Sequence, residues 1–184
     1  SIDPIVCGSA IVQNLQHIVS RNSNPKETLV ITVASFQSGK ANNVIPKTAK
    51  LNGTIRYYND EIGKMAKKRF YDVINSTSAA FGAKAVITFK KGYPATVNHK
   101  KQSEFAFNVA QKVNGKNSSN IQNPMMGSED FSFMLNEVPG SFIFIGAGDK
   151  NHNKPCHHAE YDFNDEILPA GTSYWIKLVQ HLLK

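Results

Sequence analysis

The chain has 184 residues, of which 41% are hydrophobic and 19% charged, and it carries a formal net charge of +7. This composition is typical of a globular protein with one large domain or two small ones. No apolar run approaches the roughly 20 residues of a membrane span and no signal peptide is recognisable, so we expect a cytoplasmic protein without a membrane partner.

The first half of the chain predicts alternating helices and strands. Asp3 is placed to cap a first helix and Pro4 to begin it, while Gly82 is placed to end a second one. The expected elements are a helix at 3–20, strands at 29–36 and 48–58, a helix from 60 to 80, and a strand at 85–89. This order matches a ferredoxin-like βαββαβ unit without its first strand, which we expect to precede Ser1.

The second half predicts mainly helices around one apolar strand. The expected elements are a helix at 101–113, a short helix beginning near Ser128, a strand at 142–145, a long loop, and a C-terminal helix that carries residues 174–182. The strand is apolar on both faces, which is typical of a strand inside an α/β sheet. One strand cannot form such a sheet, so its partners are expected outside this segment.

Acids and imidazoles that could form a site are found in the last third of the chain. His157 and His158 follow the apolar strand in a loop, where they are either metal ligands or solvated side chains. Glu129 and Asp130 are expected in the first turn of the short helix, where acids also favour the helix dipole. The residues alone leave both interpretations open.

Two polar residues of the first half could bind a ligand. Asn43 lies in the loop between the two expected strands, where asparagine usually forms a turn. Arg56 lies on the polar face of the second strand, where its guanidinium could hold a carboxylate with two parallel hydrogen bonds or contact solvent.

Several segments together resemble the M20 metallopeptidases. The resemblance is to the branch of aminoacylase-like amidohydrolases, which includes hippurate hydrolase and the indole-acetyl-amino-acid hydrolases. The segments are SIDPI at 1–5, NVIP at 43–46, GTIR at 53–56, MGSEDF at 126–131 and HHAEYDF at 157–163. They occur in the family's order over nearly the whole chain.

The resemblance implies a fold, a reaction and a set of site residues. Residues 1–95 would be a ferredoxin-like lid that also forms a homodimer, and residues 96–184 the C-terminal part of an α/β, zinc-peptidase-like catalytic domain. His157 would be a metal ligand, and Asn43 and Arg56 would hold the substrate. Glu129 and Asp130 would line the active site. The intact enzyme would use zinc, manganese, cobalt or nickel to hydrolyse the amide bond of an N-acyl amino acid or a related peptide.

The chain departs from the family in what it lacks. It has no Cys-Gly-His-Asp-like segment and no Glu-Glu pair that would supply the general base and a ligand, and Ala159 stands where the family usually has proline. Because metal hydrolysis needs several ligands and a base, we expect no catalytic residue, no tight metal binding and no activity in this chain alone.

Two other functions compete with this one. The first is a non-catalytic dimerisation or interaction module. The second is a ferredoxin-like RNA binder, which is disfavoured because the strands lack the required aromatic pattern and the basic run at 64–69 is typical of a solvated helix face. We therefore expect no nucleic-acid partner.

Overall fold

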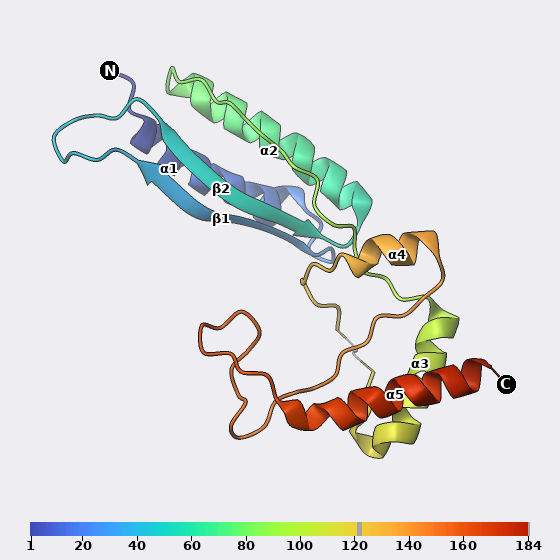
Figure 1. The fold of residues 1–184 in the computed structure, drawn as a ribbon. Helices are drawn as coiled ribbons and strands as arrows, with labels where there is room; N and C mark the ends of the chain where they lie inside the picture. The colour runs from blue at the N-terminus through green and yellow to red at the C-terminus, as the bar shows by residue number, and fades with distance from the viewer. Residues whose placement is uncertain (121–122, 184) are drawn as a thin grey trace. The chain divides into compact units, whose positions relative to one another are not determined.

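The computed structural model describes residues 1–120 and 123–183. The chain forms two compact units, Ser1–Gly92 and Tyr93–Lys184 (Figure 1). The first unit combines helices with a sheet, whereas the second consists of helices joined by irregular segments. Among the described residues, no helix is both long and apolar enough to cross a membrane.

Helix α1 (Pro4–His17) begins where the sequence predicts. The side chain of Asp3 accepts hydrogen bonds from the backbone N–H groups of Ile5 at 2.8 Å and Val6 at 3.4 Å. These N–H groups have no partner inside the helix, so the cap satisfies them. A π-helical turn, η1 (Ile18–Asn22), follows directly, and helical structure therefore ends two residues beyond the predicted limit.

Strands β1 (Leu29–Ser38) and β2 (Ala49–Tyr57) form an antiparallel two-stranded sheet in the described part of the chain. Gly53 of β2 approaches β1 so closely that an added Cβ would collide with the carbonyl oxygen of Thr32. Only glycine fits this position without moving a strand.

Helix α2 (Asp60–Ala80) and α1 cover the same face of this sheet (Figure 1). The helix ends at Phe81 and Gly82 as predicted, and Gly82 has the positive φ of 68° that favours glycine. The apolar side chains of α2 and β2, such as Phe70 and Ile55, pack on the core. Each fully buried aliphatic side chain there stabilises the unit by about 1.5–3 kcal/mol. The buried core residues are Cys7, Ile11, Leu15, Ile18, Leu29, Ile31 and Ala66.

The strand predicted at 85–89 is wrong, because this segment forms no strand in the structure. It returns along α2 instead (Figure 1), and the ring of Phe89 packs against Phe70 at 6.0 Å and Tyr71 at 6.4 Å between ring centroids. Val86 is 91% exposed. A strand needs a neighbour for its backbone hydrogen bonds, and the neighbour expected in a βαββαβ unit is the first strand, which the described residues do not contain.

The second unit is organised around the helices α3 (Lys100–Asn114) and α5 (Leu168–Leu182). Their contact buries Ala106 and Val109 of α3 and Tyr174 of α5, and the Nζ atom of Lys112 lies 2.7 Å from Nε2 of His181. The helices predicted at 101–113 and at the C-terminus are confirmed. The helical elements of the unit are α3 (Lys100–Asn114), η2 (Gly115–Asn117), α4 (Phe131–Glu137), η3 (Asp165–Ile167) and α5 (Leu168–Leu182).

The strand predicted at 142–145 is also wrong. The side-chain amide of Asn98 takes the place of a neighbouring strand at one residue, since it accepts from the N–H of Phe142 at 2.7 Å and donates to its carbonyl at 2.8 Å. Phe144 is 56% exposed. An apolar segment without a strand beside it cannot form the ladder that defines a sheet. The α/β sheet and the ferredoxin-like arrangement therefore remain predictions.

Candidate functional site

His157 lies in a tight turn within the loop that joins the 142–145 segment to α5. The backbone N–H of His158 donates to the carbonyl of Pro155 at 3.1 Å, which closes a four-residue turn with His157 in its third position. His157 has a φ of 71°, and it is the one non-glycine residue with positive φ among those that the structure describes. Such strained conformations persist only where surrounding contacts hold them, and they cluster at functional sites.

The two adjacent histidines have different environments. Nδ1 of His158 accepts a hydrogen bond from the backbone N–H of Glu160 at 3.1 Å, and the carbonyl of His158 accepts from the N–H of Tyr161 at 3.0 Å. His158 is thus part of the turn. Within the described residues the exposed ring of His157 has no hydrogen-bonding partner, so its ring nitrogens are not engaged by the turn.

Asp149 and Asn164 connect the two ends of this loop. The Nδ2 group of Asn164 donates to Oδ2 of Asp149 at 3.1 Å and to the carbonyl of Ala147 at 3.1 Å. Oδ1 of Asp149 accepts from the backbone N–H groups of Asn151 and His152, both at 2.7 Å, and lies 2.9 Å from Nδ1 of His152. These hydrogen bonds, the backbone bond from His152 foremost, lower the pKa of Asp149.

Neither Asp149 nor Asn164 is among the residues identified from the sequence. Asn164 also caps η3, because its Oδ1 accepts from the N–H of Glu166 at 3.0 Å. An asparagine directly before an acidic helical turn is a recognisable capping signal, but the contact with Asp149 has no signature in the sequence.

Glu129 and Asp130 precede helix α4 rather than forming its first turn, so the predicted start near Ser128 is wrong. The helix begins at Phe131 because the backbone carbonyls of Glu129 and Asp130 accept the first N–H groups, from Ser132 at 3.2 Å and Phe133 at 3.0 Å. The carboxylate of Asp130 forms no cap. No group of three or more His, Cys, Asp or Glu side chains in the described residues could hold a metal ion. The structure does not therefore join these acids to His157 in a ligand cluster.

Asn43 and Arg56 both lie in the first unit. Asn43 is exposed in the turn between β1 and β2. Arg56 lies on β2 opposite Val30 and is half-buried. Its neighbours Ile55 and Tyr57 pack on the core, so alternation directs Arg56 to the other face of the sheet.

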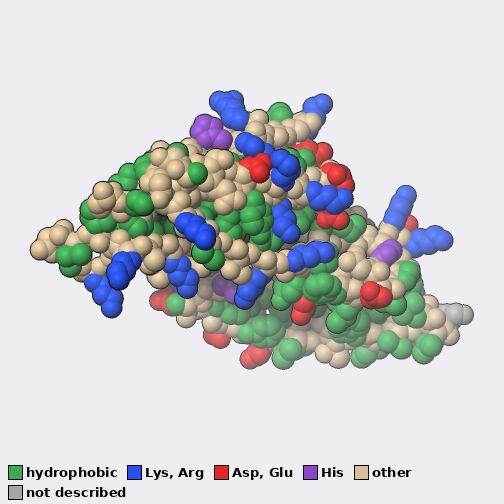
Figure 2. All heavy atoms as spheres, turned by 90° about the horizontal axis from the view of Figure 1, so that it is seen from above, with side chains coloured by type: hydrophobic (Ala, Val, Ile, Leu, Met, Phe, Trp, Pro, Cys, Tyr) green, Lys and Arg blue, Asp and Glu red, His purple; other side chains and the backbone are tan. Residues whose placement is uncertain are grey.

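The basic run on α2 has the character of a solvated helix face. Lys64 pairs with Glu61 at 2.6 Å, and Asp72 pairs with Lys68 at 3.1 Å and Arg69 at 3.3 Å, all through side chains at least 40% exposed. Lys and Arg side chains are interspersed with Asp and Glu on the face seen in Figure 2. Neighbouring acids thus offset the charge that a nucleic-acid surface would need.

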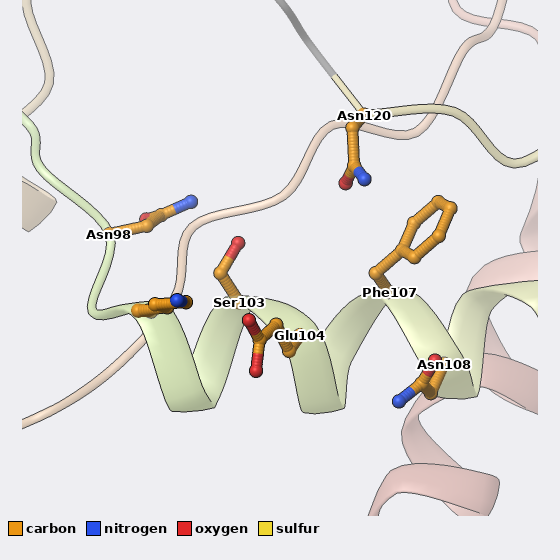
Figure 3. Close-up of a pocket in the computed structure, with 7 residues that line it drawn as sticks. Asn98, Ser103, Glu104, Phe107, Asn108 and Asn120 are labelled. Atoms are coloured by element: carbon orange, nitrogen blue, oxygen red, sulfur yellow. The ribbon is translucent and has the colours of Figure 1, made fainter.

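A hollow of about 540 Å³ lies along α3 in the second unit (Figure 3). It contains none of the site residues predicted from the sequence, and its lining is mainly polar. The lining residues are Asn98, Lys100, Ser103, Glu104, Phe107, Asn108 and Asn120.

Comparison with known proteins identifies relatives of this chain. The family model of Peptidase family M20/M25/M40 matches residues 8–181. Over 94% of its length the chain is 36% identical to the IAA-amino acid hydrolase ILR1-like 4 of Arabidopsis thaliana, and over 99% it is 31% identical to the hippurate hydrolase of Campylobacter jejuni. These matches cover 41% and 47% of the two relatives, so the chain spans less than half the length of the curated relatives it matches.

A solved structure agrees with the sequence comparisons in fold. A dinuclear metal binding peptidase of the M20 family from Bacillus subtilis matches with a TM-score of 0.75 at 24% identity. The match covers 99% of this chain and 46% of that protein. The motifs, the family match and the fold agree, and the chain belongs to the M20/M25/M40 family of peptidases.

Proposed function

We propose that this chain is the lid and the C-terminal catalytic segment of a metal-dependent amidohydrolase, which cleaves the amide bond of an N-acyl amino acid or a related peptide. The observation that carries the proposal is the exposed His157 ring, which has no partner among the described residues and is held at positive φ in the HHAEYDF segment of a chain of this family. Support for amide hydrolysis comes from the two curated relatives, which are named for hydrolysing an amino acid conjugate and hippurate.

His157 fits the role of one ligand to a divalent metal ion, namely zinc, manganese, cobalt or nickel. A hydrolytic zinc site usually takes three protein ligands and keeps one position open, and the metal polarises the bond that is cleaved. The described residues hold no cluster of three ligands. The remaining ligands and the general base would therefore come from residues outside this sequence, and this chain alone would bind metal weakly and have no activity.

Each unit has a separate part in the proposal. The first unit is the lid, in which Asn43 contacts the backbone of the substrate and Arg56 holds its free carboxylate through paired hydrogen bonds. The second unit is the C-terminal part of the catalytic domain, with Glu129 and Asp130 bordering the active site.

The surface of α5 supports the proposal that the second unit is completed by further residues. Trp175 is 60% exposed and Leu182 is 65% exposed, and Ile176 and Val179 between them are exposed as well. Contiguous apolar patches of this kind usually mark an interface in proteins. In the proposed enzyme, the residues that complete the metal site also cover this face.

A second candidate function is a non-catalytic dimerisation module. In the described sheet β1 and β2 each pair along one side only, so each strand leaves an edge that could pair with another chain. The same edges could form the homodimer of the proposed enzyme. Sedimentation of the chain over a range of concentrations tests the dimer, and a monomer at every concentration would contradict it.

The function is tested by expressing the chain together with the coding sequence upstream of Ser1 and measuring hydrolysis of hippurate with added zinc, manganese, cobalt or nickel. We expect metal-dependent hydrolysis that His157→Ala abolishes. His158→Ala is the matched neighbouring variant, and we expect it to retain part of the activity. Full activity in the His157→Ala protein would contradict the proposed ligand, and hydrolysis without metal would contradict the proposed mechanism.

A further inference from the structure

We propose that Asp149 and Asn164 are positioning residues, whose contact closes the loop of residues 150–163 and holds His157 at the positive φ from which its ring can bind metal. This inference rests on the proposed function, because it assigns a purpose to the conformation of the proposed ligand. The contact between the two side chains is itself independent of that function.

Asn164 is the fixed end of this contact. It is 5% exposed, and each of its polar side-chain atoms has a partner: Nδ2 donates to Asp149 and to the carbonyl of Ala147, and Oδ1 accepts from the N–H of Glu166. A buried amide with all its hydrogen bonds formed has one orientation, because any rotation would leave a polar group unsatisfied. Asn164 therefore fixes the end of the loop relative to its start.

Asp149 connects this fixed point to the loop. One carboxylate oxygen accepts from Asn164, while the other accepts from the backbone N–H groups of Asn151 and His152 and lies within hydrogen-bond distance of the His152 ring. Hydrogen bonds to a charged carboxylate are stronger than those between neutral groups. The first residues of the loop are thereby turned back toward Asn164.

The loop has few other means to hold His157 in its conformation. None of the described residues at 150–163 is buried, so no core packing fixes the turn. Inside the loop, Lys154 and Glu160 pair at 3.1 Å, but these side chains are 43% and 71% exposed, and such surface pairs contribute little. The turn at Pro155–His158 is closed by a single backbone hydrogen bond. Among the described residues, the closures of the loop that involve a buried side chain are the hydrogen bonds of Asn164 to Asp149 and to the carbonyl of Ala147. Of these, the contact with Asp149 continues into the loop, and it is the one we expect to support the strained residue.

The test measures amide hydrogen exchange in the whole chain by NMR, with Asp149→Ala and Asn164→Ala compared to the unaltered protein. The amides of His158 and Tyr161 report the turn around His157, and those of Val109 and Tyr174 report the α3–α5 core. We expect each variant to accelerate exchange at His158 and Tyr161 by about tenfold or more, as loss of a hydrogen bond to a charged group predicts. Exchange at the core amides should not change.

Two further variants separate positioning from a general loss of structure. In the double variant Asp149→Asn/Asn164→Asp the amide at 149 can donate to the carboxylate at 164, but that carboxylate cannot donate to the carbonyl of Ala147 as Asn164 does, so we expect slow exchange at His158 to be restored only in part. Lys154→Ala removes only the exposed ion pair and should have little effect. The inference would be overturned if amide exchange at Val109 and Tyr174 accelerated as much as at His158, or if neither single variant accelerated exchange at His158.

A metal probe distinguishes failure of this inference from failure of the proposed function. Dilute Mn²⁺ added to the unaltered chain should broaden the ring signals of His157 more than those of His158, and the broadening should decrease in Asp149→Ala. If Mn²⁺ leaves His157 unaffected while Asp149→Ala still accelerates exchange at His158, the loop closure stands and the assignment of the metal ligand is wrong. Undiminished broadening in Asp149→Ala would overturn the inference that the closure presents His157 to a metal.

Discussion

Replacing His157 with glycine should leave the second unit more stable than replacing it with alanine, although both changes remove the proposed ligand. A non-glycine residue in the left-handed region costs roughly 1–2 kcal/mol, and His157 is in that region at a φ of 71°. Glycine removes this cost but loses about 0.5–1 kcal/mol through the greater freedom of its unfolded backbone. The two ranges differ by about 0–1.5 kcal/mol, so at their midpoints we expect His157→Gly to be more stable than His157→Ala by about 0.75 kcal/mol, which corresponds to about 3–6 °C in Tm for a unit of this size.

Thermal unfolding followed by fluorescence measures this difference in the correct unit, because Trp175 is the chain's single tryptophan and lies on α5. Ala159→Gly is the matched control, since Ala159 does not have positive φ and its replacement should be neutral or slightly destabilising. A His157→Gly protein that melts no higher than His157→Ala would refute the reasoning that the turn is strained at this residue.

Three further predictions concern the sheet, the loop and the substrate. Gly53→Ala forces a Cβ against the carbonyl of Thr32, so it should lower the free energy of unfolding by about 1–3 kcal/mol in urea titrations followed by circular dichroism; an unchanged midpoint would contradict this. Hydrogen bonds, chiefly from the backbone of His152, lower the pKa of Asp149. The stabilisation by its carboxylate should thus be complete at pH values above the ordinary pKa of 3.8, and it should disappear as the pH falls through the lower pKa of the folded state. A pH titration of the NMR shift of the His152 amide measures this pKa, and a midpoint at pH 3.8 or above would contradict the lowered pKa. In the longer protein, Arg56→Lys should raise KM for hippurate about tenfold or more because lysine cannot form the paired hydrogen bonds. KM for hippurate whose free carboxylate is replaced by an amide should not change. An equal change in KM for both substrates would exclude Arg56 as the carboxylate contact.

Local signals predicted the helices and the core faces well. Asp3 with Pro4, and Gly82 after the second helix, are capping signals that act within one turn of the chain, and the start of α1 and the end of α2 lie where these signals predict. The alternation along β2 likewise placed Arg56 on the polar face, between Ile55 and Tyr57 that pack on the core, because the period of a strand does not depend on its neighbours.

The failures concern features that depend on distant partners. The segments at 85–89 and 142–145 have the composition of strands, but a strand exists only beside another, and the described residues offer them none. Similarly, the residues alone gave His157 and His158 the same two interpretations, whereas the turn gives only His158 a hydrogen bond to its ring. The contact of Asp149 with Asn164 joins the two ends of a loop, and no local pattern encodes it.

The central claim is that His157 is one ligand of a metal site completed outside this sequence. Calorimetric titration of zinc tests it most directly, with this chain alone and with the longer protein that includes the coding sequence upstream of Ser1. The account predicts no tight stoichiometric binding by the chain, and tight binding by the longer protein that His157→Ala weakens. Tight one-to-one binding by the chain alone, or binding by the longer protein that His157→Ala leaves unchanged, would contradict it.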